Sequence, residues 1–489
     1  MQMKELKLFI GGEEVASTSG TMYDNIFPAT REVISKVHVA SEVDIDKAVA
    51  SAKLAQKAWA QVSPKERGEI LYRAGQILRA RNAEIAMEEV LDVGKPIQEA
   101  DCADVDSAWQ ALEFFGGGAV TLMSGEYFDL GNGSHAYTRR EAIGVVGCIG
   151  AWNYPIQGVA WKSAPALLAG NAVIFKPSEY TPTTALTMAK VYKEAGLPDG
   201  LFNVVLGYGD VGACLVNHKD IHKISLTGSV PTGKKIMQAC STDLKHLTLE
   251  LGGKSPVIVF DDADIDNAVS GAMMANFYTQ GEVCSNGTRV FVQEGIYDAF
   301  MEKLISRTKK MTIGDPRDAE IQIGAMIHED QFNKVMGYIN RAKDAGLELV
   351  CGGNSVTVAG CEKGFFIEPT IFTNVPDDAE ITTDEVFGAV MGVYPFKQED
   401  EVIRRANDTI FGLSAGIFTL DIQKAHRVIG ELQAGTCWIN NYNLTPTGVP
   451  FGGFKQSGFG RENCHQSLDA YTQIKSVYVE GGDVETFYA

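Results

Sequence analysis

The spacing of apolar residues changes along the chain, from a helical period in the first part to short apolar segments further on. Residues 63–66 combine a capping serine, proline at the first helical position and glutamate at the third. Apolar residues then recur at helical spacing, at positions 70, 71, 74, 77 and 78. The pattern predicts one helix from residue 64 to about residue 93, where Gly94 and Pro96 end it.

From about residue 144, short β-rich segments alternate with helical ones. The predicted strands cover residues 145–152, 172–175, 201–206 and 223–226, and the predicted helices cover residues 155–168, 181–195 and 231–239. A second series starts with a strand near residue 256 and a helix from about Ile265, and it continues to about residue 440. Because such alternation is typical of parallel sheets, we predict an α/β protein with two doubly wound parallel-sheet domains.

Two β-rich segments, residues 126–140 and 473–479, alternate in polarity without a core of their own. We expect them to lie at a subunit interface. The chain shows no internal repeat at a fixed period.

Composition narrows the classes of partner and compartment. The 62 acidic and 43 basic side chains give a net charge of -19, which repels nucleic acid and anionic membrane surfaces. The nine cysteines are odd in number and scattered, which fits neither a disulfide framework nor a zinc site and favours a reducing compartment. No leader pattern and no apolar run approaching 18 residues is present, so we expect a cytoplasmic protein that does not span a membrane.

Two glycine-rich segments follow predicted strands. Residues 207–212 satisfy G-x-G-x-x-G, which indicates either a dinucleotide site or a plain tight turn. Residues 228–234 approach a phosphate loop, but Lys235 stands where magnesium binding needs serine or threonine, which argues against a nucleotide triphosphatase. In both segments a strand ends before a helix N-terminus that attracts phosphate, so Gly209, Gly228 and Ser229 are candidate cofactor contacts.

Five segments in chain order resemble the motifs of the NAD(P)-dependent aldehyde dehydrogenase family. They are Trp-Asn-Tyr-Pro at residues 152–155, Lys-Pro-Ser-Glu at 176–179, Leu-Glu-Leu-Gly-Gly-Lys-Ser-Pro at 249–256, Gly-Glu-Val-Cys at 281–284 and Glu-Val-Phe-Gly at 385–388. Further stretches at residues 151–167, 286–291, 439–443 and 458–463 resemble the branch that oxidises betaine aldehyde and 4-trimethylaminobutyraldehyde. The resemblance spans nearly the whole chain.

The resemblance implies a division of the chain into three parts. A Rossmann-like NAD-binding domain would comprise residues 1–125 and 144–254, and a catalytic domain residues 255–465. Residues 126–143 and 466–489 would form an oligomerisation arm. The expected assembly is a homotetramer built as a pair of dimers.

The resemblance also assigns roles to the reacting groups. The thiolate of Cys284 would add to the aldehyde carbon, and the Asn153 amide with the Cys284 backbone N–H would bind the oxyanion. Glu250 would activate the water that cleaves the thioester, and its place at the end of an apolar run would raise its pKa by partial burial. Lys162 and Glu462 resemble a proton-relay pair, with a structural ion pair as the alternative.

For the cofactor, the resemblance places the adenosine ribose on Lys176 and Glu179, a phosphate at Ser229 and the nicotinamide ribose on Glu385. Further candidate contacts are Trp152, Leu251 and Phe387. A carboxylate at position 179 accepts hydrogen bonds from a free 2′-hydroxyl and repels a 2′-phosphate, so NAD is favoured, with NADP as the alternative. Monovalent cation sites for an ion such as K⁺, with Asp92 as a candidate, are compatible with the resemblance, and no other metal site is predicted.

Substrate selection is predicted to depend on aromatic rings. Four of them resemble a box around a trimethylammonium group, with a core stripe as the alternative: Tyr154, Trp161, Tyr278 and Phe451. Each ring would attract the cation by about 0.5 to 2 kcal/mol. Tyr442 is expected nearby, and the small Cys437 would leave room for the headgroup.

The sequence departs from the family pattern at two positions. Glu282 replaces the usual glutamine, and we expect its charge to raise the pKa of Cys284 or to help hold a cation. Ala389 replaces the usual proline after Phe387 and Gly388, so the backbone geometry of this segment, which is expected to contact the nicotinamide, is expected to differ from the family pattern.

The predicted function is NAD-dependent oxidation of betaine aldehyde to glycine betaine through a cysteine thiohemiacetal and thioester. The alternative substrate is 4-trimethylaminobutyraldehyde or another aminoaldehyde. Two other classes are a phosphate-loop nucleotidase, which requires a hydroxyl residue at position 235, and a non-catalytic scaffold, which does not need Cys284 and Glu250 together.

Overall fold

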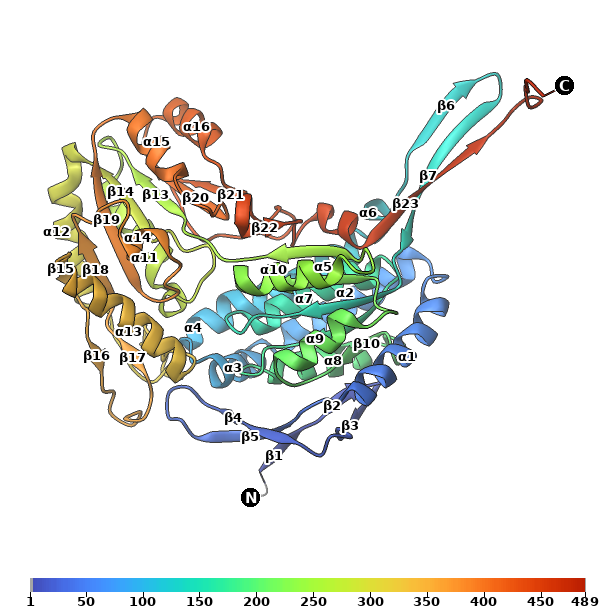
Figure 1. Ribbon diagram of the computed structural model, residues 1–489, viewed down its shortest axis with the longest axis horizontal. Helices are drawn as coiled ribbons and strands as arrows, with labels where there is room; N and C mark the ends of the chain where they lie inside the picture. The colour runs from blue at the N-terminus through green and yellow to red at the C-terminus, as the bar shows by residue number, and fades with distance from the viewer. Residues whose placement is uncertain (1–2, 489) are drawn as a thin grey trace.

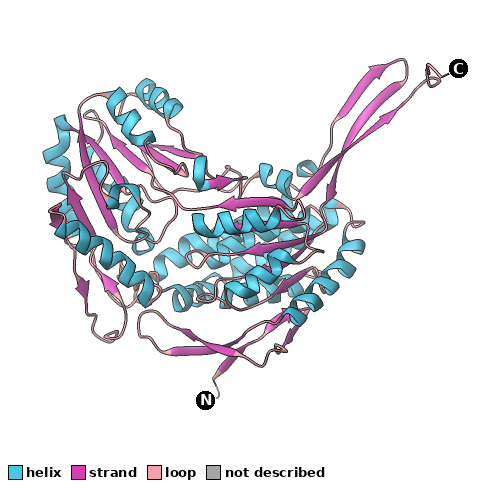
Figure 2. Ribbon diagram, in the orientation of Figure 1, coloured by secondary structure: helices cyan, strands magenta, loops and turns pink. Residues whose placement is uncertain are grey.

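A computed structural model describes residues 3–488 of the chain. Two helix-covered sheets form the body of the molecule, and a long three-stranded arm projects from it (Figures 1 and 2). Parallel strands make up the centre of both sheets, which confirms the predicted α/β fold class.

The first sheet has eight strands in the order β22-β12-β11-β8-β9-β10-β2-β3. Its parallel strands are β8 (Val145–Ile149), β9 (Ala172–Lys176), β10 (Phe202–Val204), β11 (Lys223–Thr227) and β12 (His246–Glu250). Antiparallel strands extend both edges: β2 (Leu8–Ile10), β3 (Glu13–Val15) and β22 (Gly458–Phe459). The strand order reverses at β8, and ligands of such sheets bind at this switch point, beyond the carboxyl ends of β8 and β11.

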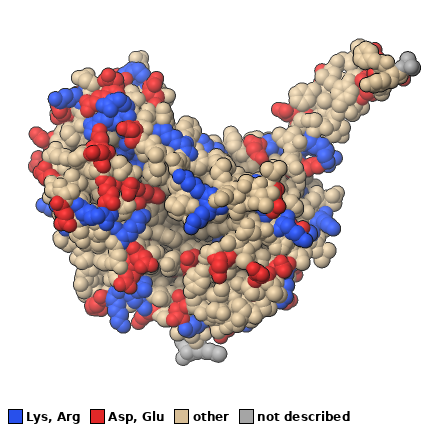
Figure 3. Space-filling view, viewed as in Figure 1, with Lys and Arg blue, Asp and Glu red and all other residues tan. Residues whose placement is uncertain are grey.

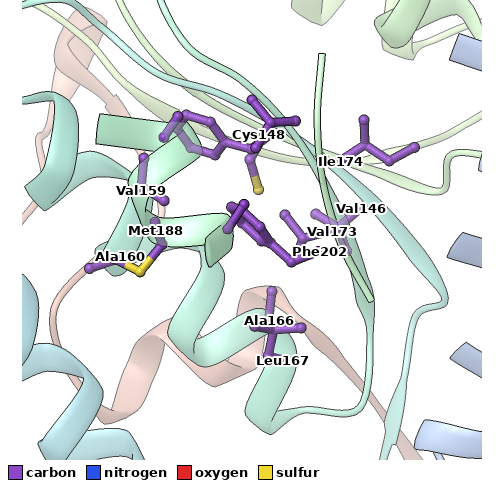
Figure 4. Packing of buried hydrophobic residues seen from close by; sticks show 14 of the residues in the cluster. Val146, Cys148, Val159, Ala160, Ala166, Leu167, Val173, Ile174, Met188 and Phe202 are labelled. Carbon is purple, nitrogen blue, oxygen red and sulfur yellow. The ribbon is translucent and has the colours of Figure 1, made fainter. Parts of the chain in front are cut away.

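Helices cover both faces of this sheet and separate its strands along the chain. They are α1 (Glu42–Trp59), α7 (Pro155–Leu168), α8 (Thr183–Glu194), α9 (Gly209–Asn217) and α10 (Val230–Cys240). Figure 4 shows part of this core: Cys148 of β8 faces the α7 side, where Val159 and Leu167 lie, whereas Ile174 of β9 is on the opposite face of the sheet. Because both faces are covered, these strands are apolar at nearly every position rather than at alternate ones.

The predicted single helix over residues 64–93 is wrong, because two helices occupy this segment. α2 (Pro64–Ala80) ends at Arg81, which has φ -110° and ψ 18°, and α3 (Asn82–Val93) begins at the next residue. The Asn82 side chain donates to the backbone and side-chain oxygens of Asp101, contacts that need the chain to change direction here. The predicted stop is confirmed, since Gly94 caps α3 in the left-handed conformation.

The second sheet has seven strands in the order β15-β18-β19-β14-β13-β20-β21. They are β13 (Pro256–Val259), β14 (Arg289–Gln293), β15 (Glu348–Cys351), β18 (Thr370–Thr373), β19 (Val390–Phe396), β20 (Ser414–Phe418) and β21 (Thr436–Ile439), of which only β15 is antiparallel to its neighbour. Its helices are α11 (Ile265–Phe277), α12 (Tyr297–Thr308), α13 (Glu329–Asp344), α15 (Glu399–Asn407) and α16 (Ile422–Glu431). After β21 the chain returns to the first sheet, where β22 pairs with β12.

Two small sheets complete the architecture. The arm consists of β6 (Tyr127–Gly131), β7 (Ser134–Ala142) and β23 (Thr472–Val479), so the two segments predicted to be β-rich pair with each other. A sheet that the sequence pattern did not predict contains β1 (Lys4–Leu6), β4 (Met22–Ile26) and β5 (Val33–His38).

The longer helix α5 and several short elements complete the chain. They are α4 (Ile97–Glu99), the π-helical turn η1 (Ala100–Asp104), α5 (Val105–Gly117), α6 (Ala119–Leu122), η2 (Tyr278–Gly281), η3 (Glu294–Ile296), β16 (Ser355–Val356), β17 (Phe366–Ile367), α14 (Glu380–Thr383), η4 (Lys455–Ser457) and η5 (His465–Ala470). Among residues 3–488, no helix is both long and apolar enough to cross a membrane.

Candidate active site

Two cavities meet beyond the carboxyl ends of β8, β11 and β12. The larger has a volume of about 320 Å³ and the smaller about 170 Å³. Six residues line both of them: Ala151, Asn153, Thr227, Glu250, Leu251 and Cys284. The predicted nucleophile, oxyanion amide and base therefore lie together at the junction of the two cavities.

Asn153 and Cys284 are brought together by two connections from different sheets. The strand predicted over residues 145–152 ends at Ile149, which frees the following residues to enter the site. The Asn153 Nδ2 donates to the carbonyl oxygen of Glu282 at 2.9 Å, next to the nucleophile. One N–H of this amide thus fixes the side chain, and the second is left for an oxyanion.

The turn before Cys284 has an uncommon backbone. Thr279, Gln280 and Gly281 have φ values of 48°, 41° and 80°. At Gly281 a Cβ would lie 2.1 Å from the Gly388 carbonyl carbon, so only glycine fits there. Such strain persists only where surroundings hold it, and the Glu99 carboxylate accepts hydrogen bonds from both the N–H and the hydroxyl of Thr279.

Burial and two carboxylates raise the pKa of the Cys284 thiol to about 12; the carboxylates are Glu385 and Glu250. Glu282, expected to raise this pKa or to help hold a cation, is not among the groups that raise it. Its carboxylate accepts from Gln280 Nε2 at 3.0 Å and from the Ile327 N–H at 3.4 Å, and burial raises its pKa to about 8.

Glu250 is the last residue of β12 and is 4% exposed. Neither of its carboxylate oxygens has a hydrogen-bond partner among residues 3–488. Burial raises the pKa of Glu250 well above its usual value, and Glu462 raises it further, whereas Lys162 acts in the opposite direction. A carboxyl group with a raised pKa and no hydrogen-bond partner, beside a nucleophile, is suited to general acid–base chemistry.

The smaller cavity contains many of the predicted cofactor contacts. It is lined by Trp152, Gly228, Ser229, Leu251, Glu385 and Phe387 as well as by the shared residues. Ser229 caps α10, so the N-terminus of an eleven-residue helix lies at this cavity, where it would attract a phosphate.

The remaining predicted cofactor residues lie outside the lining of this cavity, at the ends of neighbouring strands. The ammonium of Lys176 is 3.6 Å from the Glu179 carboxylate and donates to the carbonyl oxygen of Pro177. Gly209 is the first residue of α9, and a Cβ there would meet nothing within 4 Å.

Two residues that the sequence analysis missed hold the loop with Glu385 and Phe387. Gln331 Nε2 donates to the Phe387 carbonyl at 2.6 Å, and Lys334 Nζ donates to the Glu385 carbonyl at 3.1 Å. Both side chains come from the first turns of α13 and also line the smaller cavity. Their spacing of three residues places them on one helix face, but nothing in the polar sequence of α13 marks them as functional.

All four predicted box residues line the larger cavity: Tyr154, Trp161, Tyr278 and Phe451. The rings of Trp161 and Phe451 meet edge to face with centroids 5.6 Å apart. The lining also includes the polar residues Asp104, Asp106 and Ser107, which the sequence analysis had not named.

Tyr442 and Cys437 do not line either cavity. Tyr442 is buried, its hydroxyl donates to the Ser285 carbonyl at 2.8 Å, and its ring packs on Trp438. Cys437 packs against the core of the second sheet, so the structure separates both residues from the aromatic box.

Lys162 and Glu462 form a buried ion pair, and Lys162 also donates to the Ser225 hydroxyl at 3.2 Å. Glu462 lines the larger cavity. The ion pair therefore connects the larger cavity, through Glu462, to Ser225 of β11, through Lys162.

A cysteine, an asparagine and a buried glutamate thus lie together at the junction of two cavities in an α/β fold. Residues 15–477 match the aldehyde dehydrogenase family, and the chain belongs to this family. The predicted family and enzyme class are thereby confirmed, which decides against the nucleotidase and the scaffold.

Relatives whose names state an activity agree with this assignment. The chain is 58% identical over 480 residues to betaine aldehyde dehydrogenase of Mesorhizobium japonicum, covering 98% of each sequence, and 58% identical with the same coverage to betaine aldehyde dehydrogenase of Brucella anthropi. The NAD⁺ complex of an aldehyde dehydrogenase from Bacillus cereus has a TM-score of 0.94 at 40% identity, with 97% of this chain and 96% of that chain covered. An NAD-dependent aldehyde dehydrogenase from Sinorhizobium meliloti has a TM-score of 0.96 at 36% identity, with 100% and 97% covered.

Proposed function

We propose that this protein oxidises betaine aldehyde to glycine betaine with NAD as the hydride acceptor. One observation carries the proposal: Cys284 lies where the larger cavity, which is lined by aromatic rings, meets the smaller cavity. The smaller cavity is lined by the N-terminus of α10 and by Glu385. The names of relatives 57–58% identical over 98% of the chain support this substrate. The alternative is 4-trimethylaminobutyraldehyde or another aminoaldehyde.

Four rings of the larger cavity supply the substrate recognition in this proposal. A trimethylammonium group cannot donate hydrogen bonds, so its recognition depends on ring faces and on negative potential. Tyr154 is held in place at both ends, since its hydroxyl lies 2.9 Å from the Thr279 hydroxyl and the Lys95 ammonium lies 3.8 Å from its ring centroid. The neighbouring Asp106 adds negative charge to the same cavity, whereas Asp104 is paired with the Lys95 ammonium.

The reaction starts at Cys284. Because its pKa is raised to about 12, the thiol is neutral at pH 7 and loses its proton to solvent as the sulfur adds to the aldehyde carbon. The oxygen of the adduct receives hydrogen bonds from the free N–H of the Asn153 amide and from the Cys284 backbone N–H. The residues of the smaller cavity would hold NAD, which would supply the acceptor for the hydride that leaves the adduct, and the thioester would remain on Cys284.

Glu250 then acts on water. Its raised pKa makes the carboxylate a stronger base once ionised, and its position at the cavity junction lets it take a proton from the water that attacks the thioester. The Lys162–Glu462 ion pair beside it receives the proton in this scheme.

The residues present fit NAD. Glu385 and the α10 N-terminus at Ser229 line the smaller cavity, where they would hold a ribose and a phosphate. Only glycine fits at position 252, because a Cβ there would lie 2.0 Å from a Glu385 oxygen. Glu179 beside Lys176 favours a free 2′-hydroxyl, and hence NAD over NADP.

A monovalent cation such as K⁺ beside Asp92 does not fit the contacts. The Asp92 carboxylate already accepts from Asn25 Nδ2, the Thr183 N–H and the Thr183 hydroxyl. These donors already occupy the Asp92 carboxylate, and a monovalent cation site elsewhere in the protein stays a prediction.

We also propose that the arm joins subunits into a homotetramer of two dimers. The arm is largely uncharged in Figure 3, whereas acidic and basic side chains are interspersed over the visible face of the body. Large apolar side chains are exposed on it, including Tyr127, Leu130 and Ile474, and exposed patches of this kind mark interfaces. Light scattering of the intact protein and of a variant with charged residues at these three positions tests the assignment.

Three further expectations stay proposals. The division into an NAD-binding domain (residues 1–125 and 144–254), a catalytic domain (255–465) and an arm (126–143 and 466–489) is one. A cytoplasmic location is another, supported by nine cysteines that all lack a disulfide partner. The third is the absence of nucleic acid as a partner, which rests on the net charge of -19.

The test of the activity is steady-state NADH formation with a panel of aldehydes. Betaine aldehyde is expected to give the highest kcat/KM, followed by 4-trimethylaminobutyraldehyde. If 3,3-dimethylbutanal, which has the same shape without the charge, were used equally well, the protein would be a general aldehyde dehydrogenase.

A further inference from the structure

Two aromatic side chains outside the reacting groups bridge the two bodies of the fold. Tyr180 follows Glu179 in the connection between β9 and α8, and His328 is the residue before α13. Their rings stack with centroids 4.2 Å apart and an angle of 25° between planes. The pair thus links the strand end that carries Lys176 and Glu179 to the helix that carries Gln331 and Lys334.

His328 also fixes the start of α13. Its Nδ1 accepts a hydrogen bond from the Gln331 N–H at 3.1 Å, so the ring serves as the N-cap of the helix. The side chain of the same Gln331 donates to the Phe387 carbonyl. The imidazole therefore sets the position of the residue that holds the Glu385–Phe387 loop.

The loop needs this support because Phe387 has φ 62°, a conformation that a phenylalanine adopts only when neighbours impose it. Two neighbours do so. Gln331 binds its carbonyl, and the Trp152 ring meets the Phe387 ring edge to face at 5.2 Å. Trp152 in turn meets His328 edge to face at 6.3 Å, so the ring of His328 lies at the centre of a connected set of contacts.

We propose that Tyr180 and His328 are a positioning pair for the cofactor: their stack holds the start of α13, and through Gln331 the Phe387 loop, in the arrangement that binds the nicotinamide ribose. Neither residue touches the reacting atoms, and neither lines the two cavities. The inference rests on the NAD dependence within the proposed function, and it is independent of which aldehyde is oxidised.

The experiment separates the stack from the cap with four variants of the full-length protein. Y180F keeps the stack and Y180A removes it. H328N keeps an acceptor for the cap without the ring, and H328F keeps the ring without the acceptor. NAD affinity is measured by calorimetry without aldehyde, ADP affinity serves as the control ligand, and melting temperature without ligand reports folding.

If the pair positions the nicotinamide end, Y180A, H328N and H328F each weaken NAD binding by about five- to tenfold, a loss of the size expected for one aromatic contact or one cap. Y180F stays within about twofold of wild type. ADP, which lacks the nicotinamide ribose, binds the His328 variants as it binds wild type. The double variant Y180A/H328N loses no more NAD affinity than the single variant that binds NAD less tightly, because both changes remove the same ring stack.

NAD affinity within about twofold of wild type in Y180A and H328N overturns the proposal, as do additive losses in the double variant or equal losses for NAD and ADP. If the His328 variants melt at a much lower temperature, Y180A and Y180F alone decide, since Tyr180 lies in a loop and its change leaves the cap in place. A wrong aldehyde assignment would appear in the substrate panel and would leave all of these NAD affinities unchanged.

Discussion

Glu462 raises the pKa of Glu250 while the ammonium of its ion-pair partner Lys162 lowers it, so a single buried pair acts on the base in both directions. Removing either partner would leave an uncompensated buried charge at a cost of about 3 to 5 kcal/mol. The base is therefore best tested by changing Glu250 itself, whose carboxylate makes no hydrogen bond within the described residues.

Replacing Glu250 with Gln is expected to preserve acylation and to slow hydrolysis. The amide keeps the size of the side chain but cannot take a proton from water, so rapid mixing should show a burst of NADH near one per site. The steady state that follows should be slower than wild type by about a hundredfold or more. A linear trace without a burst would show that Glu250 acts before hydride transfer.

Replacing Cys284 with Ala should abolish turnover and spare NAD binding. The thiol forms the adduct, whereas the contacts expected for the cofactor come from the Glu385 loop and the α10 N-terminus. We expect kcat below about a thousandth of wild type, with NAD affinity within twofold by calorimetry. Substantial residual turnover would assign the nucleophile to another residue.

The alkylation of Cys284 should depend steeply on pH. Because burial, Glu385 and Glu250 raise the pKa of the thiol to about 12, the thiolate fraction rises with pH throughout the range from 7 to 9. The rate of inactivation by iodoacetamide in the absence of NAD should increase about tenfold per pH unit without a plateau. Mass spectrometry of the labelled peptide, with C284A as the control, identifies the site. A plateau near neutral pH would mean that the thiol is activated in the free protein.

Much of this site follows from local sequence, and the rest depends on which segments the fold brings together. The α/β class could be predicted because buried parallel strands are apolar throughout, as in β8 and β9. Cys284, Asn153 and Glu250 stand in distinctive motifs. Gln331 and Lys334 could not be found, because a polar residue facing a cavity and one facing solvent look alike in a single sequence.

The predictions that were wrong also failed because contacts between distant segments decide the structure at those positions. The break at Arg81 interrupts a continuous helical pattern, since contacts of Asn82 with Asp101 outweigh local propensity. The sheet of β1, β4 and β5 has short strands with mixed exposure, a pattern too weak to predict. Tyr442 was placed near the headgroup by sequence neighbours, but its hydroxyl bond to Ser285 turns it into the core.

Changing Glu179 should alter the choice of cofactor. Its carboxylate lies 3.6 Å from the Lys176 ammonium, so the change to Ser removes a repulsive charge and frees a cation for a 2′-phosphate. The ratio of kcat/KM for NADP to that for NAD should rise by at least about tenfold, equivalent to about 1.4 kcal/mol. E179Q, which keeps the size and removes only the charge, is the matched control. An unchanged ratio in both variants would show that the carboxylate does not face the ribose.

The last prediction concerns the headgroup. Trp161 is held by two neighbours, because its Nε1–H donates to the Ser107 hydroxyl at 3.0 Å and its ring meets Phe451 edge to face. Trp161 lines the larger cavity, where a quaternary ammonium over the indole ring would gain about 1 to 2 kcal/mol over a neutral group of the same shape. W161L should therefore lower kcat/KM for betaine aldehyde by about tenfold while 3,3-dimethylbutanal loses much less. W161F, which keeps a ring face but loses the bond to Ser107, should fall between the two. Equal losses for the charged and neutral aldehydes in W161L would make the ring ordinary packing, and the preference for a cation would then have to come from Asp106.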